Sequence, residues 1–238
     1  MLKDGVRMFS EYKYKTELHA HTRPASPCSQ INPEYMIDAY LKKGYTSLAI
    51  TNHFILGLLD QDPKIQIKKY FENYYRTEEI AKKCGLNLIL GSEIRFTENN
   101  NDYLIYGICE EDFLEISNLL DYGIDNFYKE FKNDRNIIIQ AHPFRNGIEL
   151  ANPESIDGIE VFNLHPGHNS KIGYAAQFAA AHDFIITCGT DFHHFGHEGI
   201  CGILTKEPIK DSYQLAQILK SRDYIIDISG YKVIPKID

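Results

Sequence analysis

The sequence lacks any apolar run close to the ~20 residues that a helix needs to cross a bilayer. Its first residues, MLKDGVRMFSEYKYK, contain no apolar core of the kind that signal peptides carry. No internal repeat, Gly/Ser-rich linker or low-complexity tract interrupts the 238 residues. These absences predict a cytoplasmic protein without a membrane partner, built as a single domain over residues 1–238.

The sequence is also poor in cysteine and in basic residues. Its five cysteines are an odd number and no two have CxxC spacing, which favours free thiols over a disulfide scaffold or a cysteine zinc site. Lysine and arginine number 25 against 33 aspartate and glutamate, which gives a formal charge of −8. Because phosphate backbones are bound by an excess of basic residues, we expect no long nucleic acid as partner. The oligomeric state is left open.

The chain does contain a repeated order of a short apolar run followed by a longer helical pattern. Apolar runs predict strands at 16–18, 47–51, 86–94, 103–108, 136–141, 158–162 and 184–189. Helical periodicity covers 33–43, 65–84, 111–132 and 171–182, with Gly44 and Gly85 as helix ends. Residues 224–235 alternate enough to form a final strand or extension. This order predicts an α/β fold with a mainly parallel sheet, either open or closed as a barrel.

Polar residues stand directly after these apolar runs. They are His19, His21, His53, Glu93, His142, Asn163, Asp191 and His193. The carboxyl ends of the strands of a parallel α/β barrel meet at one mouth, where active sites are built. We therefore expect one site at the C-terminal strand ends, assembled from scattered segments.

Two of these segments share a spacing that suits metal binding. In His19-Ala-His21 and in Asp191-Phe-His193 the paired side chains are two residues apart, and in a strand such residues point to the same side. Imidazole and carboxylate ligands suit zinc, iron and manganese.

Glu93 adds a third indication, because it stands within the apolar run LILGSEIRF. A carboxylate is costly to bury unpaired, so we expect a cation beside it. Arg95 is the alternative partner, but it lies one residue further out on the same face. Taken singly, His53 and His142 are ordinary strand-end histidines. Five strand ends with ligand residues at the same relative position together predict a metal centre.

The motifs HAHT, TNH, GSE, AHPFR and GTDFHH, in this order and spacing, resemble those of the polymerase and histidinol phosphatase (PHP) family. The resemblance implies a distorted (β/α)7 barrel that binds two or three divalent ions (Zn, Fe or Mn) at its mouth. It implies that His19, His21, Glu93 and Asp191 hold one ion and that Glu93 bridges to a second ion at His142. It further implies that His53 and His193 hold a third.

The chain departs from the family pattern at four places. Glu17 and Asn52 stand where the family usually has Asp. The loop RPASPCSQ offers only Cys28 or a serine where relatives often supply an acidic or histidine ligand to the third site. Asp102 stands where relatives use a histidine at the second site.

The resemblance implies a phosphoesterase in which a metal-activated water attacks the phosphorus of a small phosphate ester, either a phosphomonoester or a nucleotide-type ester. We assign Asp191 and His142 to catalysis. Arg145 is the expected phosphate-binding residue because its planar fork suits bidentate contacts, and His194 or His197 is expected to protonate the leaving group. His165 and His168 follow another strand end and either line the substrate cleft or are solvated loop histidines, and we favour the second interpretation. His182 is interpreted as a helix-end residue.

Two alternatives stay open. A metal-dependent amidohydrolase also begins with HxH on a first barrel strand, but it typically needs a bridging lysine that has no counterpart at a strand end here. A catalytically silent PHP module that binds a partner would have lost several ligands, whereas here only the third site looks incomplete.

Overall fold

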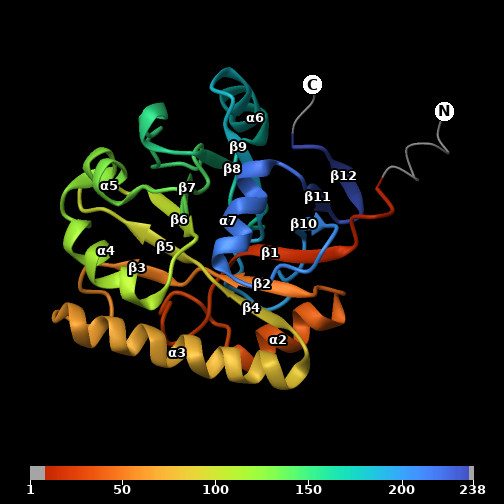
Figure 1. Ribbon diagram of the computed structural model, residues 1–238, viewed down its shortest axis with the longest axis horizontal. Coiled ribbons are helices and arrows are strands. Elements are labelled where there is room, and N and C mark those ends of the chain that lie inside the picture. Colours follow the sequence, from red (N-terminus) through yellow and green to blue (C-terminus); the bar gives the residue numbers. More distant parts are fainter. Residues whose placement is uncertain (1–8, 236–238) are drawn as a thin grey trace.

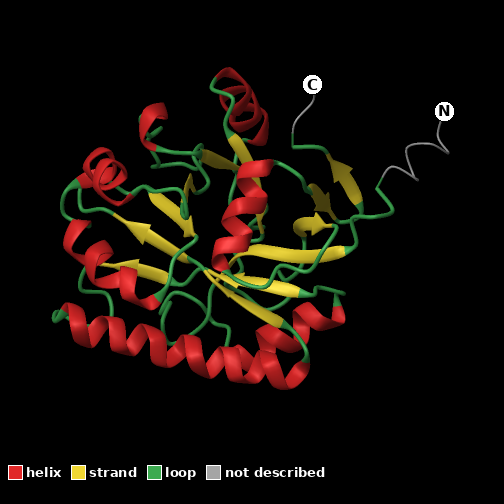
Figure 2. Ribbon diagram, viewed as in Figure 1, coloured by secondary structure: helices red, strands yellow, loops and turns green. Residues whose placement is uncertain are grey.

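The structure is a computed structural model that describes residues 9–235. Its strands form two six-stranded sheets, with helices packed around them (Figures 1 and 2). The first sheet has the order β12-β11-β10-β1-β2-β4 and the second the order β3-β5-β6-β7-β8-β9. Residues 1–8, which include most of the stretch expected to lack a signal core, lie outside the described part. No helix between residues 9 and 235 is long and apolar enough to cross a membrane.

The strands of the first sheet are β1 (Tyr14–Ala20), β2 (Ser47–Ile50), β4 (Asn87–Leu90), β10 (Cys201–Thr205), β11 (Ile225–Ile228) and β12 (Tyr231–Val233). Those of the second are β3 (His53–Ile55), β5 (Ser92–Arg95), β6 (Asp102–Tyr106), β7 (Ile137–Gln140), β8 (Gly158–Asn163) and β9 (Ile185–Gly189). The predicted α/β class is confirmed. The expectation of a mainly parallel sheet is wrong, because parallel and antiparallel pairs are equally frequent. The pairing gives two mixed sheets of six strands each.

The helices are α2 (Pro33–Lys42), α3 (Pro63–Cys84), α4 (Phe113–Leu119), α5 (Gly123–Phe131), α6 (Ile172–Ala181) and α7 (Ser212–Ser221), with short 3₁₀ turns at Glu110–Asp112 and Pro153–Ser155. Helices α2 and α3 lie side by side along the lower edge in Figure 1, and α6 packs on β8. Asn32 and Asp62 cap α2 and α3 by accepting from backbone N–H groups of the first turn. Gly44 and Gly85 follow these helices with φ of 77° and 81°, which confirms the two predicted helix ends.

The predicted helix over 111–132 is interrupted between α4 and α5. Gly123 has a φ of 76°, and a Cβ added there would lie 2.1 Å from the carboxylate of Glu98. Glu98 Oε1 accepts a hydrogen bond of 2.9 Å from the N–H of Ile124. A carboxylate from a distant segment therefore caps a new helix at this point, which ends the continuity that the periodicity suggested.

The predicted strand over 86–94 is likewise two strands, β4 and β5, which belong to different sheets. Gly91 separates them, and a Cβ added there would lie 2.9 Å from Thr51 Cγ2 and 3.0 Å from Tyr106 Cε1. The neighbouring strand changes sheets at the same level, because β2 ends at Ile50 and β3 begins at His53. Backbone hydrogen bonds from Gly91 to Ile50 and from Glu93 to Asn52 carry the pairing across the change.

Both faces of the central strands are buried. Ile137 and Ile139 of β7 contribute to one apolar cluster, and Ile138 contributes to another. The same alternation holds in β6, where Leu104 and Tyr103 fall in different clusters. Successive side chains of a strand point to opposite faces, so strands covered on both sides read as continuous apolar runs. This arrangement explains why the runs were visible in the sequence.

Candidate metal centre

The candidate ligands come together at one end of the sheets. His19 lies in β1 and His21 just beyond it, while His142 follows β7 by two residues and Asp191 follows β9 by two. His53 and Glu93 lie three residues beyond β2 and β4, as the strand-end pattern requires, but the chain there continues as β3 and β5. His53 and Glu93 are direct neighbours in the parallel β3–β5 pair.

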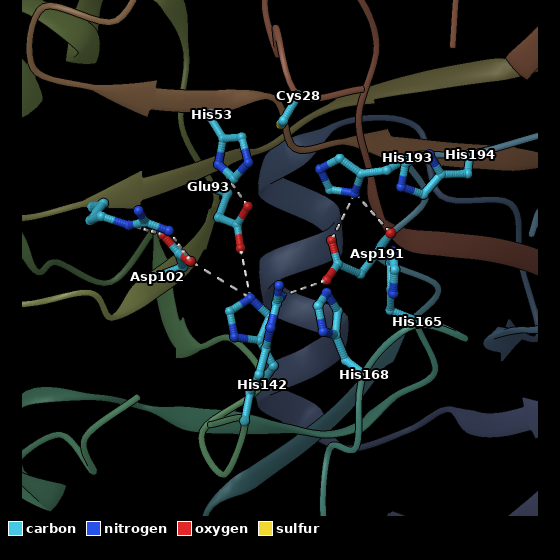
Figure 3. Close-up of a pocket in the computed structure, with 12 residues that line it drawn as sticks. Cys28, His53, Glu93, Asp102, His142, His165, His168, Asp191, His193 and His194 are labelled. Atoms are coloured by element: carbon cyan, nitrogen blue, oxygen red, sulfur yellow. Dashed lines mark hydrogen bonds and ion pairs between the residues drawn. The ribbon is translucent and has the colours of Figure 1, made fainter. Parts of the chain in front are cut away.

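Glu93 is the centre of the group. Its side chain is 1% exposed, and its two oxygens face four imidazoles, of which those of His53 and His142 are drawn in Figure 3. The distances are 2.9 Å to His53 Nδ1 and 3.3 Å to Nε2 of His19, His21 and His142. Arg95 pairs instead with Asp102, through bonds of 2.7 and 2.8 Å. The alternative of a Glu93–Arg95 salt bridge is therefore wrong, and within residues 9–235 the ion pairs of Glu93 are all with histidines.

Asp191 lies across the cavity from Glu93 and contacts a partly shared set of residues. Its Oδ1 is 3.6 Å from Nε2 of both His19 and His21 and 3.2 Å from Nδ1 of His193. Its Oδ2 accepts a 3.5 Å hydrogen bond from Arg145 Nη1. The two carboxylates thus lie on either side of the His19–His21 pair.

Several of these buried atoms have no hydrogen-bond partner within residues 9–235. They are His19 Nε2, His21 Nε2, His53 Nδ1 and both carboxylate oxygens of Glu93. They lie within ion-pairing distance of one another but not in hydrogen-bonding geometry. Leaving one buried polar atom unpaired costs about 1–3 kcal/mol, so a cluster of them calls for a shared partner. Imidazole nitrogens and carboxylate oxygens turned toward one another are a donor set that fits divalent cations.

Three groups of donors, each with atoms within 4.8 Å of one another, have the spacing to hold an ion. They are His19 with His21 and Asp191; His21 with His53 and His193; and His53 with Glu93 and Asp102. The groups overlap at His21 and His53. The first and the third group share no residue.

The charges within the group reinforce one another. Burial raises the pKa of the Glu93 carboxyl, but His19 and His53 more than reverse this and hold it well below its ordinary value. Burial lowers the pKa of His19, yet Glu160, Glu93 and Asp191 raise it well above the ordinary value. Burial also dominates at His21, where neighbouring His193 and His53 lower the pKa further. The carboxylates are thus ionised and available as ligands.

Two candidate ligands have left-handed backbone conformations, His142 with φ of 33° and Asp191 with φ of 51°. Such conformations are uncommon outside glycine, and His, Asn and Asp adopt them more readily than other residues. Strain of this kind concentrates at functional sites, where the surrounding structure fixes it. Here it turns the side chains that follow β7 and β9 back into the cavity.

Glu160, in β8, is a buried residue of the site that the sequence analysis missed. Its Oε1 accepts a 2.9 Å hydrogen bond from Nδ1 of His19, and its Oε2 accepts from the N–H of His142 at 3.1 Å. Because Nδ1 of His19 donates to Glu160, Nε2 is the nitrogen left to bind a cation, and it faces Glu93 and Asp191. The sequence did carry a signal, since Glu160 interrupts the apolar run GIEVF just as Glu93 interrupts its own.

Two of the four positions at which the chain differs from the family pattern, Glu17 and Asn52, have structural roles. Glu17 is buried and accepts hydrogen bonds from Thr190 and Tyr40, which ties β1 to the segment after β9. Asn52 Oδ1 accepts from the N–H of Thr22 and from Ser26 Oγ. Both residues position ligand-bearing segments and do not contact the donor atoms.

Cys28 and Asp102 both line the cavity. Burial raises the pKa of the Cys28 thiol, but the neighbouring imidazoles of His193 and His53 outweigh burial and lower it to about 6. In Figure 3 Cys28 lies between His53 and His193. Asp102 is held by Arg95 and lies 3.7 Å from Nε2 of His142. All five cysteines of the chain are free, as predicted.

The cavity has a volume of about 250 Å³. Arg145 and His194 line it, and so do His165 and His168, whose rings are 4.4 Å apart. The interpretation as a solvated loop histidine is therefore wrong for His165, which is 8% exposed, because the segment after β8 turns back over the cavity. It holds for His168, which lies in the loop after β8 and is exposed although it also lines the cavity. His182 lies at the end of α6 against Phe178 and Phe184, as expected of a helix-end residue.

Comparison with known proteins adds three solved structures that resemble this chain. PsfC from Pseudomonas syringae PB-5123 has a TM-score of 0.60 at 15% identity, over 84% of this chain and 86% of that one. A two-domain protein from Bacteroides vulgatus ATCC 8482, said to contain a predicted PHP-like metal-dependent phosphoesterase, also has a TM-score of 0.60 at 15% identity, over 92% and 66%. An amidohydrolase from Chromobacterium violaceum has a TM-score of 0.51 at 15% identity, over 90% and 97%. At these identities the likeness is one of fold.

No curated protein matches the chain. The sequence model of the PHP domain, however, matches residues 17–229. That span contains every candidate ligand from His19 to His193, together with Glu160 and Arg145. The chain belongs to the PHP domain family.

Proposed function

We propose that the protein hydrolyses a small phosphate ester with the help of two or three divalent ions. The observation that carries this proposal is the cluster of buried imidazole and carboxylate atoms around Glu93 that have no hydrogen-bond partner within the described residues. An arginine that can grip an anion stands at the same cavity.

The proposed ligands are His19, His21, His53, Glu93, His142, Asp191 and His193. His19, His21, Glu93 and Asp191 would hold one ion, Glu93 and His142 a second, and His53 and His193 a third. Zinc, iron and manganese all suit this set. When bound, such ions lower the pKa of a coordinated water and neutralise the charge of a phosphate.

The residues of the chain divide the remaining work. Arg145, whose Nη1 reaches Asp191 Oδ2 at 3.5 Å, is free to turn its fork toward phosphate oxygens. His194, at the rim of the cavity, is the proposed donor of a proton to the leaving oxygen. Asp191 and His142 are the proposed catalytic ligands, held by their constrained backbone. His165 and His168 close one side of the cavity and limit access of solvent.

The size and charge of the site favour a small anionic substrate. A cavity of about 250 Å³ accommodates a phosphate group with a compact leaving group. The chain as a whole carries a charge of −8, so attraction of an anion rests on local cations. A phosphomonoester or a nucleotide-type ester fits, whereas a long nucleic acid does not.

The amidohydrolase alternative is less well supported. No lysine lines the cavity within residues 9–235, and Glu93 supplies a carboxylate where a bridging lysine would stand. The likeness to the Chromobacterium amidohydrolase is one of fold. A silent binding module would not need the full set of inward-facing donors. We further propose that the two sheets form a single domain, a distorted (β/α)7 barrel with the metal centre at its C-terminal strand ends.

Metal analysis combined with phosphate-release assays tests the function. Protein purified without chelator would be analysed by plasma mass spectrometry and assayed on p-nitrophenyl phosphate and its bis ester. The variants are His142→Asn and Asp191→Asn, because asparagine tolerates the left-handed backbone at both positions. Two or more ions per chain and loss of turnover in both variants support the proposal. Fewer than one ion after zinc, iron and manganese have been offered, without turnover, would overturn it.

A further inference from the structure

We propose that the thiolate of Cys28 is a metal ligand, which completes a Cys/His site with His53 and His193 and makes this part of the centre selective for zinc over manganese. The inference deepens the proposed function and rests on it. It concerns the one position at which the chain offers sulfur instead of the acidic or histidine ligand expected at the third site.

The loop that carries Cys28 is fastened to the histidines it faces. The N–H of Gln30 donates to the carbonyl oxygen of His193 at 2.9 Å, and Ser26 Oγ accepts from the N–H of His53 at 2.9 Å. Ser29 Oγ donates to the carbonyl oxygen of His21 at 3.0 Å. The position of Cys28 relative to these three histidines is therefore fixed by hydrogen bonds on both sides of it.

The histidines form a compact set of donors. The ring of His21 lies 4.5 Å from that of His53 and 4.2 Å from that of His193, and the three have ligand atoms within 4.8 Å of one another. His21 is fully buried, and its Nε2 has no hydrogen-bond partner within the described residues. That nitrogen belongs to the ion proposed for His19, His21, Glu93 and Asp191, but His53 Nδ1 likewise has no hydrogen-bond partner within the described residues and calls for a ligand independently of the cysteine. Cys28 lines the same cavity as His53 and His193 and lies between them in Figure 3.

The other candidates in the loop are already engaged. Ser26 Oγ donates to Asn52 Oδ1 at 3.0 Å and accepts from His53, and Ser29 Oγ accepts from the N–H of Ile31 while it donates to His21. Either hydroxyl would have to give up these bonds to reach an ion. Cys28 is exposed and lines the cavity, so its sulfur is the donor that remains.

Sulfur changes the preference for the ion. Thiolate with imidazole suits zinc, whereas manganese favours oxygen ligands. When sulfur binds the ion, the thiol proton is released to solvent and no redox change occurs. The site formed by Cys28 should therefore discriminate between metals that the carboxylate-rich part around Glu93 accepts alike.

Spectroscopy of the metal-loaded protein tests the assignment without reference to turnover. Full-length protein loaded with cobalt should show a thiolate-to-metal charge-transfer band in the near ultraviolet, and zinc-loaded protein should show a sulfur shell at roughly 2.3 Å in X-ray absorption. Both signals should disappear in Cys28→Ser. They should persist in Cys84→Ser, the matched control, since Cys84 is also an exposed free thiol but lies at the end of α3.

The outcomes separate the two proposals. Metal at the full stoichiometry without a sulfur signal overturns the role of Cys28 and leaves the proposed function standing. Absence of bound metal overturns both. Cys28→Asp provides a second variant in case the serine variant folds poorly: it should lose the sulfur signal, keep its ion count and bind manganese at the expense of zinc. Retention of zinc preference in Cys28→Asp would contradict the inference.

Discussion

The candidate centre has two halves that differ in how they are held. The inner half consists of His19, Glu93, His142 and Asp191, whose side chains are at most 3% exposed. The outer half consists of Cys28, His53 and His193; the two histidines are 14% and 13% exposed, and the cysteine faces the cavity. Buried Glu160 fixes ligands of the inner half, whereas the outer half depends on loops that hydrogen bond to each other.

This difference indicates a division of labour. Ligands held by buried carboxylates lose little conformational freedom when an ion binds, so the inner half is preorganised. The outer half is open to solvent and carries the ligand chemistry that is particular to this chain. We expect the inner half to determine whether the centre forms at all, and the outer half to determine which ion completes it.

The largest effect should follow from Asp191→Asn in the inner half. Loss of this carboxylate removes a ligand and a negative charge from the His19–His21 pair, so kcat/KM for p-nitrophenyl phosphate should fall by more than about 100-fold. His53→Gln in the outer half should cost less and should remove about one ion per chain. Kinetics and metal analysis of both variants check this. Equal losses of ions and activity in the two variants would break the distinction.

A smaller effect is expected for Glu160→Gln, because Glu160 hydrogen bonds to two residues of the inner half, His19 and His142, and is not itself a proposed ligand. Without the carboxylate, Nδ1 of His19 loses its acceptor, and metal affinity should fall by about 10- to 100-fold. Titration with zinc or manganese, followed by activity, gives the affinity. Because Glu160 positions a ligand and does not bind the ion, added metal should restore most of the activity. Failure of excess metal to restore turnover in a folded variant would argue against this role.

Arg145→Lys should have a smaller effect and a different signature. Lysine keeps the charge but cannot form the bidentate contact, so KM for a phosphomonoester should rise by about tenfold while the ion count stays unchanged. Steady-state kinetics with metal analysis separates the two quantities. Loss of bound ions in this variant would place Arg145 among the residues that hold the inner half, through its contact with Asp191.

The smallest effect is expected for a variant of Asp227, which lies in β11 next to the edge strand of the first sheet. This variant serves as a reference for changes outside the metal centre. Burial raises the pKa of Asp227, but Lys15, at 2.7 Å, and Lys232 outweigh burial and lower it. Its contribution to stability is therefore complete above the unfolded-chain pKa of about 3.9 and is lost as pH falls through the folded value. Asp227→Asn should lower the free energy of unfolding by about 1 kcal/mol at pH 7.

Urea unfolding at pH 7 and near pH 3 tests this expectation. The difference between wild type and Asp227→Asn should shrink at the lower pH, while the ion count and turnover at pH 7 should match the wild type. A change in ion count would mean that β11 and the metal centre are coupled. Asp227→Asn could then not serve as a reference for the effects expected in the two halves.

Much of the site was predictable because its residues interrupt apolar runs. Glu93 and Asp191 are conspicuous in the sequence since a carboxylate beside buried strands needs a partner. Glu160 carries the same signal and was missed because its position lies inside a run rather than at its end. The α/β class followed from periodicity alone, since strands covered on both faces are apolar throughout.

What the sequence did not reveal depends on contacts between distant segments. The break at Gly123 depends on Glu98, and the change of sheet at Gly91 depends on the side chain of Tyr106. Strand β10 and helix α7 were missed as well, although Asp211 accepts from the N–H of Gln214 as a helix cap that was open to recognition. The region predicted as a final strand is the hairpin β11–β12.

The joint change of sheet by β2–β3 and β4–β5 constrains how the chain can vary in length. The pairing of Ile50 with Leu90 and of His53 with Glu93 keeps the same sequence offset on both sides of the break. A residue inserted into only one of the two crossings would slip this register and turn Glu93 away from the histidines. Insertions and deletions at these crossings are therefore tolerated only in pairs. A substitution at Cys28, by contrast, changes a proposed ligand without shifting the register of any strand.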